Sequence, residues 1–151
     1  MNVKELLAAY EKTCFVVRPT APGVVGAPPE RFELYVGKFN PAFDAWTKSV
    51  GLSCWTLITA YNPGLVRPGD AANEAANLRL AERRKERGYR FVPAEGVGES
   101  GWTEPSFFVW HMTEKKGRAL GLEFGQWAVV CGSPGCEPEL VFCVDRNTLE
   151  G

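Results

Sequence analysis

Side-chain amides and hydroxyls occupy positions in this sequence that suit the recognition of a polar molecule. Thr59 and Asn62 lie at the end of an apolar run, just before a Pro-Gly turn. Asn73 and Asn77 are four residues apart, so a helix would place them on one face, about 6 Å from each other. Polar groups fixed in this way orient small ligands through hydrogen bonds.

Arg84 extends the pair of asparagines into a stripe, because at about 100° per residue it returns to the same helix face. Asparagine is a poor helix former, since its side chain competes for backbone hydrogen bonds. Two asparagines in one helix therefore suggest a compensating role in binding. The alternative is that Asn73 substitutes for a cap and Asn77 faces water.

Glu104 and Ser106 enter an apolar strand after a glycine-rich loop. Partial burial of a carboxyl raises its pKa and suits acid–base chemistry, although Glu104 could equally anchor a ligand amine, hold Arg84 or be an exposed loop acid. Gln126 follows a helix end and offers one more amide, unless it is a solvated connection residue. The candidate ligand-binding residues are Thr59, Asn62, Asn73, Asn77, Arg84, Glu104, Ser106 and Gln126.

The inventory of nucleophiles and metal ligands is poor. His111 is the single histidine, and it lies in an apolar run where packing or an edge position is expected. Cys131, Cys136 and Cys143 do not have the spacing of a zinc site. Phosphate-loop, nucleophile-elbow and dinucleotide motifs do not occur, so no metal, cofactor or catalytic residue is predicted.

Charge and apolar patterning exclude two classes of partner. Lys and Arg number 17 and Asp and Glu 18, which gives a net charge of −1 and argues against nucleic acid. The arginines of 79–90 point to several sides of a helix and predict a solvated face. No run reaches the roughly 18 apolar residues of a membrane span. An odd number of cysteines and the lack of a signal peptide predict a reduced, cytoplasmic protein.

The helices and strands that must position these residues follow an order that is typical of a single α+β domain, over residues 1–151. The sheet is expected to be mixed or mainly antiparallel, with six or seven strands and three to four helices. Asn40 and Asp70 are expected to cap two of the helices, and Gly96–Gly101 to form a flexible loop. Helices are predicted at 2–11, 41–51, 70–87 and 114–124, and strands at 13–17, 32–36, 54–61, 89–93, 106–112, 127–131 and 140–144.

The ordered set of motifs over about residues 55–130 resembles a bacterial family catalogued as domain of unknown function 3293. That family tends to have Asn after Phe-Gly-Gln, where this chain has Trp127. The resemblance implies a small bacterial cytoplasmic domain without an established activity, and it supplies no catalytic residues. The residues that carry it are Ile58-Thr59-Ala60-Tyr61-Asn62-Pro63, Asn73, Asn77, Gly88-Tyr89, Glu104-Pro105-Ser106 and Phe124-Gly125-Gln126.

Three functions remain open from the sequence. The first is binding of a nucleotide-like or amide-bearing small molecule, although the same polar groups could instead satisfy one another in an internal network. The second is an interaction module, a homodimer or another protein partner, with Trp46, Trp102 and Trp127 as exposed anchors. The third is a hydrolase or transferase with Glu104 as base and Ser106 or Thr59 nearby.

Overall fold

The computed structural model describes residues 3–19, 31–61, 69–99, 101, 103–145 and 147. The described residues form four helices and one sheet. The helices are α1 (Val3–Glu11), α2 (Pro41–Ser49), α3 (Asp70–Glu86) and α4 (Glu114–Glu123). The strands are β1 (Cys14–Val17), β2 (Phe32–Leu34), β3 (Trp55–Ile58), β4 (Phe91–Val97), β5 (Thr103–Trp110), β6 (Ala128–Gly132) and β7 (Glu139–Phe142).

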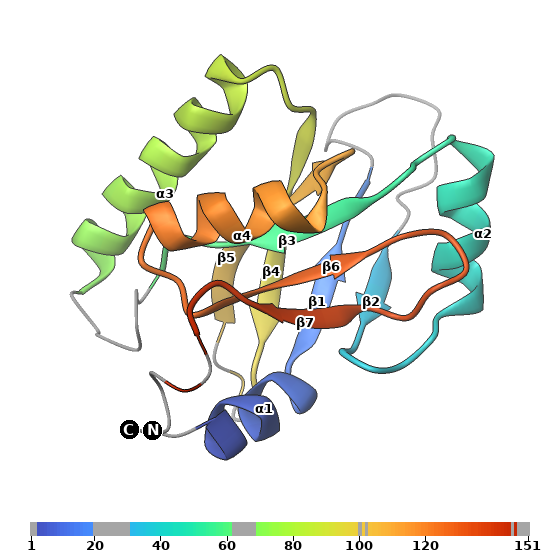
Figure 1. Ribbon diagram of the computed structural model, residues 1–151, viewed down its shortest axis with the longest axis horizontal. Helices are drawn as coiled ribbons and strands as arrows, with labels where there is room; N and C mark the ends of the chain where they lie inside the picture. Colours follow the sequence, from blue (N-terminus) through green and yellow to red (C-terminus); the bar gives the residue numbers. More distant parts are fainter. Residues whose placement is uncertain are drawn as a thin grey trace.

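The sheet has the order β2-β1-β4-β5-β3-β6-β7, and all of its described pairings are antiparallel. The predicted α+β class is thereby confirmed. Figure 1 shows the sheet strongly curled, with α1 and α2 at different ends of it and α3 beside α4. No helix within the described ranges has the length and apolarity needed to cross a membrane.

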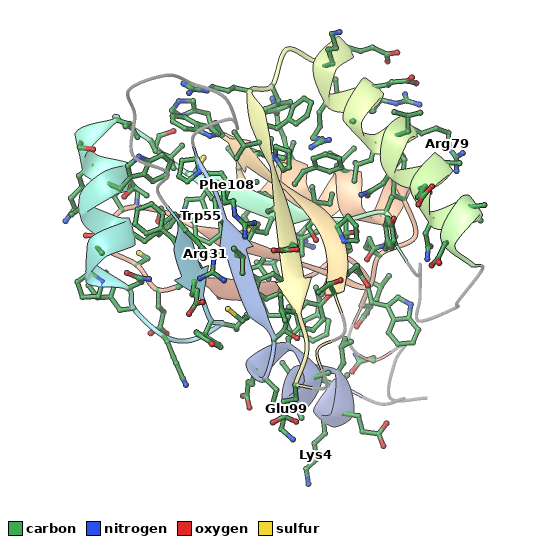
Figure 2. All side chains as sticks on the ribbon, turned by 180° about the vertical axis from the view of Figure 1, so that it is seen from behind. Lys4, Arg31, Trp55, Arg79, Glu99 and Phe108 are labelled. Atoms are coloured by element: carbon green, nitrogen blue, oxygen red, sulfur yellow. The ribbon has the colours of Figure 1, made fainter. Side chains whose placement is uncertain are left out.

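An aromatic core fills the inner face of the curled sheet. The Phe43 ring of α2 meets the rings of Trp55 and Phe108 edge-on, at centroid distances of 5.5 and 5.9 Å. Trp55 and Phe108 lie near the centre of the molecule in Figure 2. Such ring pairs contribute about 0.5–1.5 kcal/mol each beyond the area they bury. Strands β1 to β6 all contribute side chains to this core, so the sheet curls around it.

Alternation along β5 divides its side chains between the two faces of the sheet. Phe108 and Trp110 belong to the inner core, whereas Phe107 and Val109 pack in an outer cluster that includes Leu80 of α3. The run Trp55–Ile58 is fully buried, as predicted for a central strand covered on both faces. Candidate side chains that lie on opposite faces of β5 therefore cannot contact each other.

The two edge strands of the sheet approach each other at one end. The amide of Gly37, after β2, donates to the carbonyl oxygen of Pro138, just before β7, at 2.8 Å. Asp44 of α2 reinforces this junction, because its Oδ1 accepts from the Gly135 amide at 2.7 Å. The α2 helix is itself capped as predicted, with the Asn40 side chain accepting from the amide of Phe43.

The predictions for one helix cap and for the bounds of β4 and β5 were wrong. Asp70 is the first residue of α3, and Gly69 takes the cap position without a side-chain bond. Gly96 lies inside β4 and pairs with Glu104, so the expected flexible loop is shorter and β5 begins earlier. Glycine is disfavoured in strands, but here the pairing of Gly96 with Glu104 across the sheet outweighs that tendency. The predicted proline loop at 19–29, apart from Pro19, and the turn at 62–64 lie outside the described residues.

Substitution of Gly132 by alanine should destabilise the protein by about 1–3 kcal/mol, the usual cost of overpacking. A Cβ atom at Gly132 would lie 2.2 Å from Cζ2 of Trp55, inside the core. Gly96→Ala is a matched control, because its Cβ would meet Phe15 at an ordinary 3.5 Å. Urea unfolding measures both variants; equal losses of stability would contradict the packing described for Trp55.

Asp44→Asn should lower stability near neutral pH and have less effect in acid. The Gly135 amide and Lys48 hold the pKa of the Asp44 carboxyl below its ordinary value. A lowered folded-state pKa contributes stability above the unfolded pKa of about 4, and this contribution is lost as the pH falls through the folded value. Unfolding free energies measured from pH 7 to pH 2 should converge for the two proteins. Exposed Glu139→Gln serves as control.

Candidate functional site

The residues that follow β3 leave the sheet. Their main-chain groups bond to side chains instead of to a neighbouring strand. The last rung joins Ile58 to Phe107, which ends the strand before the predicted Tyr61. The Ala60 amide then donates to Oδ1 of Asn77 at 2.9 Å, and the Tyr61 amide donates to the Thr59 hydroxyl at 3.0 Å. We call residues 59–61 the exit segment.

Gln126 completes this arrangement from the turn between α4 and β6. Its Nε2 donates to the carbonyl oxygen of Tyr61 at 3.0 Å, and the residue is buried. The alternative of a solvated connection residue is therefore wrong. The predicted helix stop before it is present, since Gly125 has a φ of 73°. Both main-chain groups of Tyr61 are thus hydrogen-bonded to side chains.

Asn77 bridges two strands in the way that a peptide group would. While its Oδ1 accepts from Ala60, its Nδ2 donates to the carbonyl oxygen of Pro105 in β5 at 3.2 Å. The Thr59 hydroxyl donates to the same oxygen at 2.7 Å. Asn73, one turn earlier, is also buried. The alternative in which Asn77 faces water is wrong: its amide replaces a missing rung between β3 and β5.

Glu104 and Ser106 lie in β5, on the inner face that also carries Phe108. The Ser106 hydroxyl donates to the main-chain oxygen of Glu104 at 3.2 Å. Glu104 is half-buried rather than an exposed loop acid. Arg84 packs on the outer face against Phe107, so the two charged side chains are on opposite sides of the sheet.

Negative charge gathers around the exit segment. Burial raises the pKa of the half-buried Tyr61 hydroxyl, and the carboxylates of Glu74, Asp70 and Glu104 raise it further. The pKa of Tyr10 in α1 is raised by burial and again by Glu104. Glu104 therefore lies within electrostatic reach of both tyrosines. Neither tyrosine was among the predicted site residues, although Tyr61 stands inside the motif that carries the family resemblance.

Arg84 is completely buried, so the solvated face predicted for the arginines of 79–90 is wrong at this residue. Its guanidinium carbon lies 4.1 Å from the ring centroid of Phe91 and 3.9 Å from that of Phe107. Nε donates to the carbonyl oxygen of Leu80 at 3.3 Å. Burial lowers the pKa of Arg84 to about 9. Two turns separate it from Asn77, about 10 Å along α3.

The other chemistry-bearing residues do not join this site. His111 is exposed, contrary to the packed position expected, and its Nδ1 lies 2.8 Å from the Ser53 hydroxyl. The five cysteines are free thiols. Burial raises the pKa of Cys131 to about 11 and that of Cys143 to about 12, so both are unreactive at neutral pH. Among the described residues no group of three ligands could hold a metal ion.

The predicted site residues thus fall into three groups. Thr59, Asn77 and Gln126 converge on the exit segment, with Asn73 one helical turn away. Glu104 and Ser106 share the inner face of β5, and Arg84 lies apart from both groups. Asn62 lies outside the described residues.

Asn77→Ala should cost about 1–3 kcal/mol, because it leaves the buried Ala60 amide without its acceptor. Exposed Arg79→Ala on the same helix is the control and should change stability by less than about 0.5 kcal/mol. Chemical denaturation gives both values. Amide hydrogen exchange at Ala60 should accelerate in the Asn77 variant alone, and unchanged exchange there would contradict the bridging role.

Residues 58–129 match a protein family described as protein of unknown function (DUF3293). The match begins at the last residue of β3 and covers α3, β4, β5 and α4, so it contains the exit segment and all the side chains that bond to it. No curated protein and no solved structure matches the chain. The resemblance seen in the sequence is therefore confirmed: residues 58–129, just under half of the chain, match this family of unknown function.

Proposed function

We propose that the protein binds a small polar molecule with an amine or amide group, beside Tyr61 and Glu104. One observation carries this proposal: the exit segment is fixed by side chains from α3, from the α4–β6 turn and from its own Thr59, within electrostatic reach of the half-buried Glu104 carboxylate. Binding sites are commonly built on loops that a rigid scaffold holds in position. A segment held in this way loses little entropy when a ligand binds.

The charge of the neighbourhood favours an amine over a phosphate. Asp70, Glu74 and Glu104 all act on the Tyr61 hydroxyl, so the local potential is negative. A nucleotide would meet repulsion from these carboxylates, whereas a ligand ammonium would be attracted to them. An amide is also suited, because its N–H groups can donate to Glu104. Of the two ligand classes expected from the sequence, nucleotide-like and amide-bearing, the charge argument keeps the amide-bearing class and adds amines to it.

The same hydrogen bonds also support the alternative of an internal polar network. Asn77 and Gln126 bond to main-chain groups, which by itself explains their burial. The ligand proposal therefore depends on Tyr61 and Glu104, and the amides act as supports that hold the exit segment.

The other two functions have less support. Trp46 packs against Phe108 and Trp110 in the aromatic core, so it is no exposed anchor. Trp127 is half-buried, and Trp102 lies outside the described residues. The hydroxyls of Thr59 and Ser106 donate to main-chain carbonyls rather than to a general base. A bacterial cytoplasmic setting is part of the proposal, and the free thiols support a reducing compartment.

A thermal-shift screen with separate panels of amines, primary amides and nucleotides tests the proposal. An amine or amide at about 100 times its Kd should stabilise the protein by roughly 2.7 kcal/mol. Glu104→Gln should abolish the response to amines, because the ammonium loses its counter-charge. Tyr61→Phe should weaken binding if its hydroxyl contacts the ligand.

Glu139→Gln, an exposed acid on β7, is the matched control and should respond like the wild type. Circular dichroism establishes that each variant is folded before it is screened. A response to nucleotides alone would overturn the charge argument. A full amine response in Glu104→Gln would place binding elsewhere, and no response in any panel would contradict the proposal itself.

A further inference from the structure

The Arg84 guanidinium is a buried charge without a counter-charge in the described part of the chain. Its two terminal nitrogens, Nη1 and Nη2, are inaccessible to solvent and have no hydrogen-bond partner there. An uncompensated buried charge costs several kcal/mol, and buried arginines are normally paired with an acid. Glu123 of α4, which forms ion pairs with α3, bonds instead to Arg83 and Arg87.

The surroundings fix the orientation of this group. The rings of Phe91 and Phe107 meet at 89° and form a corner, with the guanidinium carbon about equally far from both centroids. Nε is engaged by the Leu80 carbonyl of the preceding helical turn. Rings and helix thereby hold the guanidinium and leave the edge formed by Nη1 and Nη2 as its unsatisfied side.

We propose that this edge is a second ligand site, which binds the carboxylate of a small molecule through two parallel hydrogen bonds. The planar fork of arginine matches a carboxylate in this bidentate geometry. One positive charge also balances one negative charge. A phosphate dianion would leave a surplus negative charge in a site lined by aromatic rings, which is costly. Cation–π contacts with both rings stabilise the guanidinium while the site is empty.

The site is shallow enough to be reached. Phe91 and Phe107 are only half-buried, as is Tyr89, and Gly88 with a φ of 78° begins the turn that leads to them. Both rings that flank the guanidinium are therefore partly exposed to solvent. We expect rotation of the Phe91 ring to give a small carboxylate access to the Nη1 and Nη2 edge.

This inference does not rest on the proposed function, because Arg84 and Glu104 lie on opposite faces of the sheet. The decisive experiment follows the melting temperature of the wild type in formate, acetate and larger carboxylates, against chloride and phosphate at equal ionic strength. Carboxylates should raise the melting temperature with a saturable dependence on concentration. Chloride and phosphate should not.

Arg84→Met removes the fork but keeps an unbranched apolar side chain, and replacement of an unpaired buried charge in this way is usually neutral or stabilising. It should weaken carboxylate binding by at least about tenfold, the scale expected for loss of a charge-assisted pair. Arg79→Met is the control: Arg79 is exposed on the outer side of α3 in Figure 2 and should leave the response intact. Amine binding should be unchanged in both variants.

Arg84→Lys offers a second test in case the methionine variant does not fold, since it keeps the charge and loses the planar fork. Nitrogen-15 NMR of the wild-type Arg84 side chain should show its Nη signals shifting as carboxylate is added. An equal response to chloride, a full carboxylate response in Arg84→Met or Arg84→Lys, or unmoved Nη signals at saturating carboxylate would each overturn the proposal.

Discussion

The need to satisfy the main chain where β3 leaves the sheet is the constraint on which the candidate site depends. Backbone amides and carbonyls that are buried without partners cost about as much as lost hydrogen bonds. Asn77 meets this need at Ala60 and Pro105 together, and in doing so attaches α3 to β3 and β5. Its position in α3 explains why a residue with poor helix propensity stands there. One amide thus ties the position of α3 to the exit segment, which Thr59 and Gln126 also hold.

The curled sheet gives the protein two chemical environments on opposite sides of one strand. The inner face of β5 carries Phe108 and, toward its start, Ser106 and Glu104; the outer face carries Phe107, against which Arg84 packs. Acidic groups lie near the exit segment, and a lone cation lies two helical turns away. This separation keeps charges of opposite sign from neutralising each other within the fold. One small domain would thereby present the two proposed sites, which favour ligands of opposite charge.

The sequence predicts much of this fold, because helix and strand periodicity are local properties. The Asn40 cap, the buried central strand and the stripe of Asn73, Asn77 and Arg84 all follow from spacing. The extents of β4 and β5 do not, since Gly96 is held in a strand by its pairing with Glu104. Sequence alone also gives no information on which face of β5 packs against α3. Glu104 and Arg84 stay apart because α3 packs on the face that does not carry Glu104. Tyr61 was missed because its importance comes from neighbours distant in sequence.

The hydrogen bond between Gly37 and Pro138 has a consequence for the behaviour of the protein at high concentration. The outer strands of an open sheet present unpaired amides and carbonyls that can recruit strands of other molecules. Here β2 has three residues and β7 four, and the bond joins the turns next to them. Within the described residues, each outer strand is therefore a short edge for a second chain to extend. Short outer strands joined at one end in this way are a feature that opposes aggregation through sheet edges.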